Sequence, residues 1–148
     1  MAANDKPVVC AEGAAEMCDA KFKAEIEPGD LEMILFSNDV TIDKDTVRDD
    51  LTEITGNGLD AVTLAKASFA AAAEDSGAVK SVYNSGTGIV WAGGGSRTLA
   101  ATIYGWAICF VTSGKVYLAR NWGQKVFQTD EAVTVNPVAF GETVGAVS

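Results

Sequence analysis

An uninterrupted apolar run at residues 103–111, reading IYGWAICFV, constrains the fold more than any other stretch of the chain. Successive side chains of a β-strand point to opposite faces, so a strand made from this run has two apolar faces. A strand without a polar face is covered on both sides. The run therefore predicts the central strand of a β-sandwich. Its smaller side chains are expected on one face, and its larger ones on the other: Tyr104, Trp106, Ile108 and Phe110.

A second strand-like run, residues 116–122, follows a short connection, TSGK, of the kind that joins antiparallel strands. The two runs therefore predict a β-hairpin. Polar and aromatic side chains close the second run, so we expect this strand to end at residue 122 and to open toward solvent or a partner. Arg120 and Trp122 are therefore candidate interaction residues, and Trp122 is the aromatic residue that we most expect to be exposed.

Shorter apolar segments separated by turn residues extend the β pattern through the rest of the chain. A short helix is expected near residues 46–54, where Val47, Leu51 and Ile54 recur with helical spacing. Seven or eight short strands indicate an all-β fold, an antiparallel β-sandwich that is jelly-roll-like. Besides the hairpin, strands are expected at residues 31–36, 61–70, 79–83, 88–91 and 132–138, a short extended piece at residues 125–128, and a loop at residues 70–77.

Residues 1–30 differ from the rest of the chain in composition, and a Glu-Pro-Gly-Asp turn closes them. We interpret residues 1–30 as an extended, acidic N-terminal arm and residues 31–148 as the β-sandwich domain. Within the arm, residues 20–26 alternate like an edge strand, with Phe22 and Ile26 on the apolar side. Phe22 and Ile26 are therefore candidate interaction residues through which the arm packs on the domain or on a neighbouring molecule. Disorder of the first dozen residues is the alternative.

The length of 148 residues suits one domain with a sizeable core. Its charge is unevenly distributed: residues 1–60 carry 15 acidic and 5 basic side chains, whereas residues 61–148 carry 5 acidic and 6 basic. Because clustered Lys and Arg are lacking, no binding to nucleic acid is expected. The acidic part either keeps the molecule soluble or docks on a basic partner surface.

Membrane association and export through a signal peptide are not expected. No apolar run reaches the roughly 18–20 residues of a membrane span, and the N-terminus lacks a basic and an apolar signal region. The three cysteines give no even-numbered disulfide framework, which fits a protein folded in a reducing cytosol. Cys109 is expected to be a small buried apolar residue.

The chain contains no histidine, which removes His-dependent triads and the His ligands of catalytic zinc. The glycine-rich segments SGTG and AGGGS lack the Lys-Ser/Thr of a phosphate loop and are interpreted as turns or hinges. Asp43 and Asp45 are a possible start of a calcium site, but the loop lacks the Gly and Glu of an EF-hand. Solvated or helix N-terminal carboxylates are the favoured interpretation. We expect no enzymatic activity, no cofactor, and no catalytic or metal-binding residue.

From Leu31 onward the chain resembles a group of short proteins of tailed bacteriophages and environmental viral genomes. The resemblance rests on four segments: LEMILFSNDVTIDKDTVRDDLTE, AVTLA, IYGWAICFVTSGKVYLARNW and VTVNPVAF. These proteins are small β-sandwich components of the virion that decorate or cement the capsid or attach to tail structures. The resemblance implies no activity and no catalytic residues, and it does not extend to residues 1–30.

The resemblance leads us to expect a non-enzymatic capsid decoration or cement protein. It would be located in the virion after assembly in the host cytoplasm, bind the major capsid protein and self-associate, with a homotrimer as the expected state. The alternative is a tail-fibre, head-fibre or baseplate component that binds host glycans through exposed aromatic residues near Trp122. Aromatic residues at strand spacing are, however, more often sandwich core than a sugar platform. A bacterial interaction domain in the cytosol is a third interpretation.

Overall fold

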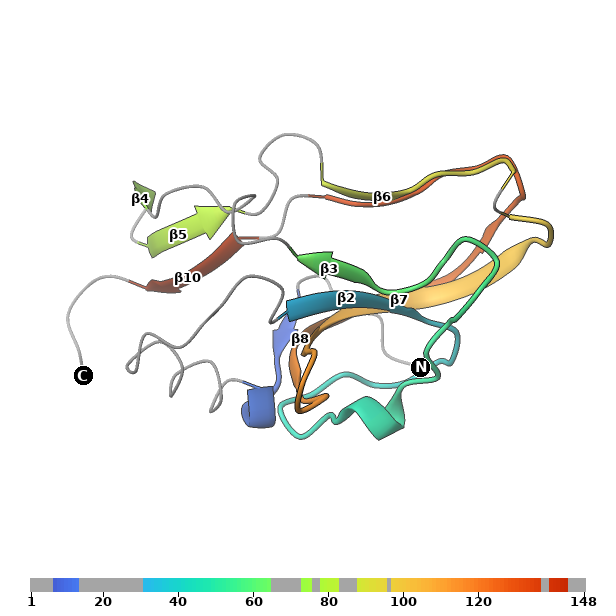
Figure 1. The fold of residues 1–148 in the computed structure, drawn as a ribbon. Helices are drawn as coiled ribbons and strands as arrows, with labels where there is room; N and C mark the ends of the chain where they lie inside the picture. The colour runs from blue at the N-terminus through green and yellow to red at the C-terminus, as the bar shows by residue number, and fades with distance from the viewer. Residues whose placement is uncertain are drawn as a thin grey trace.

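The computed structural model describes residues 7–13, 31–64, 73–75, 78–82, 88–95, 97–136 and 139–143. Within these residues the protein is mostly β, with one short 3₁₀ helix and no closed barrel (Figure 1). The largest sheet is antiparallel and has the strand order β1-β8-β7-β2-β3. Its strands are β1 (Val8–Val9), β2 (Leu31–Phe36), β3 (Val62–Leu64), β7 (Ala101–Phe110) and β8 (Val116–Phe127).

The apolar run at residues 103–111 forms most of β7, which is the middle strand of the five-strand sheet. The β-hairpin prediction is confirmed as well, because β7 pairs with β8 across the expected turn. Gly114 closes this turn with φ +73, a left-handed conformation that glycine adopts without strain. Its N–H donates to the Phe110 carbonyl at 2.8 Å, and the Phe110 N–H donates to the Lys115 carbonyl at 3.0 Å.

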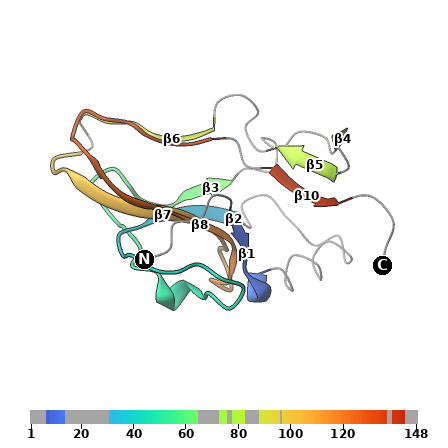
Figure 2. The same cartoon turned by 180° about the vertical axis from the view of Figure 1, so that it is seen from behind.

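A two-strand sheet, formed by β6 (Ile89–Trp91) and β9 (Val133–Val135), lies against one face of the five-strand sheet (Figures 1 and 2). The two sheets share one apolar core, because alternate side chains of β6 and β9 pack with those of β2 and β7. Burial of this apolar surface is the main force that holds the two layers together. The central members of the core include Met33, Trp91, Trp106, Ile108 and Val133.

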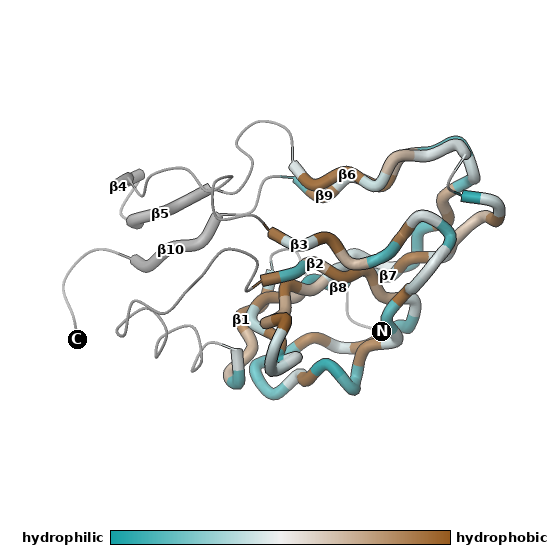
Figure 3. Tube along the Cα trace, in the orientation of Figure 1, coloured by the Kyte–Doolittle hydropathy of each residue, from teal (hydrophilic) through white to brown (hydrophobic). Residues whose placement is uncertain are grey.

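The other face of the five-strand sheet carries a second, smaller core, which a loop and the N-terminal segment cover rather than strands. The loop is residues 37–53, with the 3₁₀ helix η1 (Arg48–Asp50) within it, and the segment is residues 7–13. Ile42 and Leu51 of the loop and Cys10 of the segment pack on Ala107 and Cys109 of β7. Hydrophilic residues gather on the loops, most visibly around η1 (Figure 3).

A third sheet joins β4 (Ala73–Asp75), β5 (Ala78–Val82) and β10 (Ala139–Thr143) in the order β10-β5-β4. The β5–β10 and β6–β9 ladders pair the same two stretches of chain, residues 78–91 with residues 133–143. The third sheet lies beyond the end of the β6–β9 sheet and beside the five-strand sheet, not over it (Figures 1 and 2).

The short helix predicted near residues 46–54 is present as the 3₁₀ helix η1, which covers three of these residues. The chain is extended at both ends of η1, with φ −116 and ψ 165 at Val47 and φ −100 and ψ 127 at Leu51. The Asp50 carboxylate accepts from the Val47 N–H at 2.9 Å and so caps the start of this short turn. The chain then turns back to the sheet, where the Ile54 N–H donates to the Leu35 carbonyl at 2.8 Å.

Several strand predictions need correction. The strand expected to end at residue 122 continues to Phe127, and part of the loop expected at residues 70–77 is strand β4. The strand expected at residues 61–70 is seen as β3, and residues 65–70 lie outside the described residues. The strand expected at residues 132–138 is seen as β9, and residues 137–138 lie outside the described residues.

The predicted division of β7 into a large and a small face fails at one end. Ile103 is buried in the larger core beside Trp106, whereas Tyr104 packs against the smaller core. The β7–β8 register shifts between Ile103 and Gly105, and such irregularities redirect side chains locally. Gly123, at φ +83, lies in the part of β8 opposite this shift.

Candidate functional site

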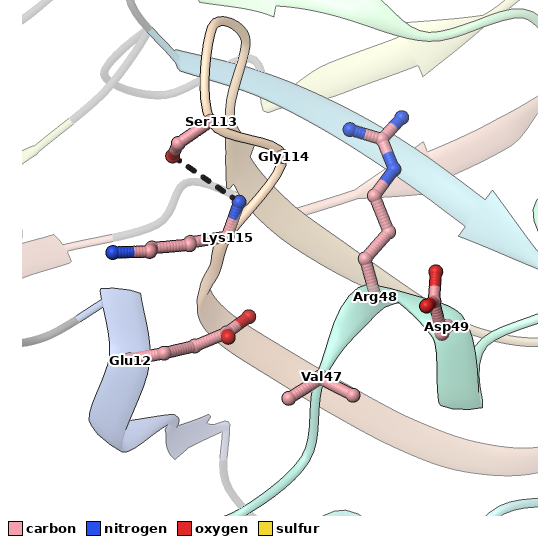
Figure 4. Close-up of a pocket in the computed structure, with 7 residues that line it drawn as sticks. All are labelled: Glu12, Val47, Arg48, Asp49, Ser113, Gly114 and Lys115. Atoms are coloured by element: carbon pink, nitrogen blue, oxygen red, sulfur yellow. Dashed lines mark hydrogen bonds between the residues drawn. The ribbon is translucent and has the colours of Figure 1, made fainter.

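A pocket of about 220 Å³ lies where the tip of the β7–β8 hairpin meets η1 and the helical turn at residues 11–13 (Figure 4). Side chains of both charge signs border it, so it suits a polar or charged group. Its lining residues come from three separate parts of the chain: Glu12, Val47, Arg48, Asp49, Ser113, Gly114 and Lys115.

Two hydrogen bonds in this pocket stabilise the fold. Glu12 accepts from the Val116 N–H at 3.0 Å, which fastens the helical turn to the start of β8. The Ser113 hydroxyl accepts from the Lys115 N–H at 3.4 Å and so supports the hairpin turn (Figure 4). The pocket is therefore formed by the junction of three chain segments. Its polar and charged lining suits the binding of a small group.

Arg48, which borders the same pocket, is held by two carboxylates on the sheet side. Its Nη1 lies 2.8 Å from Glu32 Oε1, and its Nη2 lies 2.7 Å from Glu53 Oε2. Burial of the guanidinium opposes its charge, but the hydrogen bonds to Glu53 and Glu32 outweigh this and raise the pKa of Arg48 above its usual value. All three side chains are partly shielded from water, so this network stabilises the loop on the sheet.

The two described cysteines are buried thiols in the smaller core. Burial, with smaller effects from Glu12 and Asp43, raises the pKa of Cys10 to about 11. Burial also raises the pKa of Cys109 to about 12, against the opposing effect of Arg48. Both thiols are protonated at neutral pH, and a protonated thiol is a poor nucleophile and a poor metal ligand.

The calcium alternative gains no support from the loop at residues 37–53. Asp43 Oδ1 accepts from the Asp45 N–H at 2.9 Å and from the Thr46 hydroxyl at 3.4 Å, so its carboxylate faces its own loop. Among the residues that the structure describes, no group of three acidic or cysteine side chains is placed to hold a metal ion.

Trp122 is half-buried at the end of the larger core. Its indole N–H donates to the Ile103 carbonyl at 3.2 Å, and Lys125 Nζ lies 5.0 Å from its ring centroid. Phe127 packs against it with 6.4 Å between the ring centroids. Lys125 and Phe127 also line an open pocket of about 520 Å³, together with Val126, Glu131 and Ala132.

The other predicted interaction residues are not brought to one place. Arg120 is half-buried and lies opposite Trp106 within the β7–β8 ladder, because β8 continues past it. Phe22 and Ile26 lie outside the described residues.

Two buried polar residues were not singled out by the sequence. Asn121 is fully buried on β8, and Arg97, which follows the glycine-rich segment, is 3% exposed. The sequence carries no signal for Asn121, because a polar residue in a strand more often faces water. The only signal for Arg97 is its position beside three consecutive glycines.

No helix among the described residues is long and apolar enough to span a bilayer. Comparison of the chain with protein-family models, with curated protein sequences and with solved structures found no match.

Proposed function

We propose that this protein is a non-enzymatic structural component of a phage virion, a capsid decoration or cement protein that binds neighbouring subunits of the major capsid protein. The observation that carries the proposal is a set of large apolar residues exposed around the rim of a well-covered sheet. Val9 is 49% exposed on the edge strand β1, and Leu99 and Val126 are 69% and 53% exposed near the end of the β7–β8 ladder away from its turn. Apolar residues on a sheet rim favour protein–protein contact.

The proposal includes the finer fold assignment, an antiparallel, jelly-roll-like β-sandwich for residues 31–148. Two features support it: the sheets share one core, and their ladders are antiparallel. The first strand of the sheet, β1, belongs to the proposed arm at residues 1–30, and Cys10 beside it is fully buried. Residues 7–13 therefore anchor the arm to the domain.

The physical role would be stabilisation by selective binding. A protein that binds only the assembled shell shifts the equilibrium toward assembly, because its binding free energy is available to that state alone. Binding would bury the rim residues Val9, Leu99 and Val126, and Phe22 and Ile26 of the arm would reach a neighbouring subunit.

The proposal is tested on particles purified from cells that produce the virus. Image reconstruction is expected to place density for this chain on the outer surface of the capsid. Density only on the tail or fibres would support the alternative, and complete absence from the particles would overturn both.

A second experiment tests the contact surfaces. The double variant Leu99→Asp/Val126→Asp is expected to lose co-sedimentation with shells, and Phe22→Ala/Ile26→Ala is expected to weaken it. These substitutions keep β1 in place, whereas removal of residues 1–30 would remove a strand of the sheet. Thr134→Asp, at an exposed position of β9, is the matched control and should bind as the unaltered protein does. Unchanged binding by both double variants would contradict the proposed surfaces.

The alternative, a glycan-binding tail-fibre, head-fibre or baseplate component, rests on Trp122 and on the open pocket lined by Lys125 and Phe127, which both contact Trp122. Lys125 lies over the ring where a sugar would stack, so Lys125→Ala should strengthen glycan binding and Trp122→Ala should abolish it. A glycan array without a bound sugar for either the unaltered protein or Lys125→Ala would reject this alternative.

A further inference from the structure

Arg97 is a buried cation without a carboxylate partner in the described structure. The residue is 3% exposed, and only its Nη1 is satisfied, by the backbone carbonyls of Glu131 and Gln128, the latter at 3.4 Å. Its Nε and Nη2 are inaccessible to water and have no hydrogen-bond partner among the described residues. A buried charge with unsatisfied donors is costly, and each such group in a native protein calls for an explanation.

The two unsatisfied donors have a specific geometry. The N–H groups of Nε and Nη2 lie on the same edge of the planar guanidinium and point in parallel. This edge matches two oxygen atoms of a carboxylate or a phosphate, which accept two parallel hydrogen bonds. Nη1 faces the turn at residues 128–131 and donates to its carbonyls, so this side of the guanidinium stabilises the fold. The opposite side, with Nε and Nη2, makes no hydrogen bond among the described residues.

Residues 92–95 lead to Arg97 and are packed at one end and open at the other. A Cβ added at Gly93 would lie 2.4 Å from backbone atoms of Asp130. Gly94 has φ +95, and a side chain at Gly94 or Gly95 would meet nothing within 4 Å. Among the described residues, two backbone hydrogen bonds hold this segment, from the Gly94 N–H to the Thr129 carbonyl and from the Arg97 N–H to the Gly94 carbonyl. The open pocket of about 520 Å³ lies next to it and shares Glu131, whose carbonyl Arg97 binds. The side chains that line this pocket include one positive charge, Lys125, and one negative charge, Glu131, whose carboxylate accepts from the Gln128 N–H.

We propose that Arg97 is an oxyanion-binding residue, whose Nε–H and Nη2–H take a carboxylate or phosphate group after residues 92–95 move aside. Binding neutralises the buried charge and satisfies both donors, so the bound state is more stable than the closed one. The site is independent of the proposed virion role. A carboxylate would come from a polypeptide, whereas a phosphate could be free in solution.

The test uses the full chain and compares sodium phosphate, sodium acetate and sodium chloride at equal ionic strength and neutral pH. Phosphate or acetate is expected to raise the unfolding midpoint above its value in chloride, by roughly 5–10 °C at a hundredfold excess over Kd. Arg97→Met should lose this rise, because it removes the donors. Lys115→Met, an exposed position in the other pocket, should keep it. A response to acetate and phosphate assigns a carboxylate-type site, and a response to phosphate alone assigns phosphate.

A second measurement covers a failure of Arg97→Met to fold. The Arg97 Nε–H resonance of the unaltered protein should shift on titration with the active anion, and Arg97→Lys, which keeps the charge without the paired donors, should lose the anion response. The proposal would be overturned if the Arg97 Nε–H resonance showed contact with a buried water and did not shift with phosphate or with acetate. An equal midpoint rise in Arg97→Met would overturn it as well.

Discussion

Asn121 shows how a single polar side chain can fix two segments of this fold. It has no exposed surface, and its Nδ2 donates to the Val40 carbonyl at 2.7 Å and to Asp39 Oδ1 at 3.2 Å. Its Oδ1 accepts from the Gly123 N–H at 2.7 Å. Asn121 therefore ties the start of the loop at residues 37–53 to the irregular part of β8.

Replacement of Asn121 by alanine is expected to lower the free energy of unfolding by about 2–3 kcal/mol, because partly buried backbone groups of Val40 and Gly123 lose their partner. Urea unfolding measures this loss. Asn136→Ala, at an exposed position, should stay within about 0.5 kcal/mol of the unaltered protein. Equal effects of the two substitutions would contradict the role of Asn121.

The buried thiols predict a dependence of stability on alkaline pH. Burial raises the pKa of Cys10 to about 11 and that of Cys109 to about 12 in the folded protein, from 9.0 for an exposed thiol. The unfolded chain therefore loses these protons first, so the contribution of these two thiols to stability is constant below about pH 9 and falls as the pH rises toward 11–12. Urea midpoints between pH 8 and pH 11 check this, and Cys10→Ala should show a shallower fall. If the urea midpoint of Cys10→Ala fell with pH as steeply as that of the unaltered protein, Cys10 would make no contribution to the alkaline loss of stability.

The same burial predicts slow chemistry at these thiols. In a Cys18→Ser background, the native protein should react with a maleimide at pH 7.5 far more slowly than the protein in denaturant, because only the thiolate of an accessible cysteine attacks. Mass spectrometry counts the added groups. Rapid labelling of the native protein at two sites would show that the smaller core opens readily.

At the scale of elements, the β7–β8 pair depends on close backbone contact at Gly105. A Cβ built on Gly105 would lie 2.0 Å from the Arg120 carbonyl oxygen and 2.5 Å from Phe36 Cζ. Gly105→Ala is therefore expected to cost about 3 kcal/mol or more, since the sheet must open to accept the methyl group. Gly95→Ala, which meets open space, is the control and should be close to neutral. Thermal unfolding compares the two, and a stable Gly105→Ala protein would contradict this packing.

The elements that the sequence predicts well are those whose burial decides their conformation. β2 matches its expected bounds, and β7 takes the central position that its two apolar faces require. The short helix near residues 46–54 forms only as the three-residue turn η1, because the rest of this segment is a loop: Leu51 is buried in the smaller core, while Asp50 and Thr46 bond to nearby backbone. Spacing alone does not distinguish a helical face from a loop pinned by its polar side chains.

The surroundings of Trp122 and Arg97 could not be predicted from the sequence, because they form only through tertiary packing. Lys125 and Phe127 gather at Trp122 because β8 continues past Trp122. The sequence predicts an extended piece at residues 125–128, but no local pattern joins it to the strand before it. Arg97 becomes buried only when two loops that are distant in sequence meet, as the bond to the Glu131 carbonyl shows. Such contacts depend on tertiary packing, which a single sequence does not report.

At the scale of the whole molecule, the expected self-association gives a direct test. The rim residues Val9, Leu99 and Val126 would lie at contacts between copies or with the capsid. Sedimentation equilibrium is expected to give about three times the chain mass of 15.4 kDa for a homotrimer. A mass of one chain at all concentrations would restrict self-association to the assembled particle or exclude it.

The strand order also determines when each part of the protein forms after synthesis. Within the five-strand sheet, only β7 and β8 are joined by a short turn, whereas β2 pairs with β7 from far along the chain. Distant pairings form late because closing long loops costs entropy, so we expect slow folding that begins at the hairpin. Pulse-labelled hydrogen exchange should protect β7 and β8 before β6 and β9. Until β2 arrives, a fully apolar strand is left without a neighbour on one side, and a newly made chain is most vulnerable to aggregation in that interval.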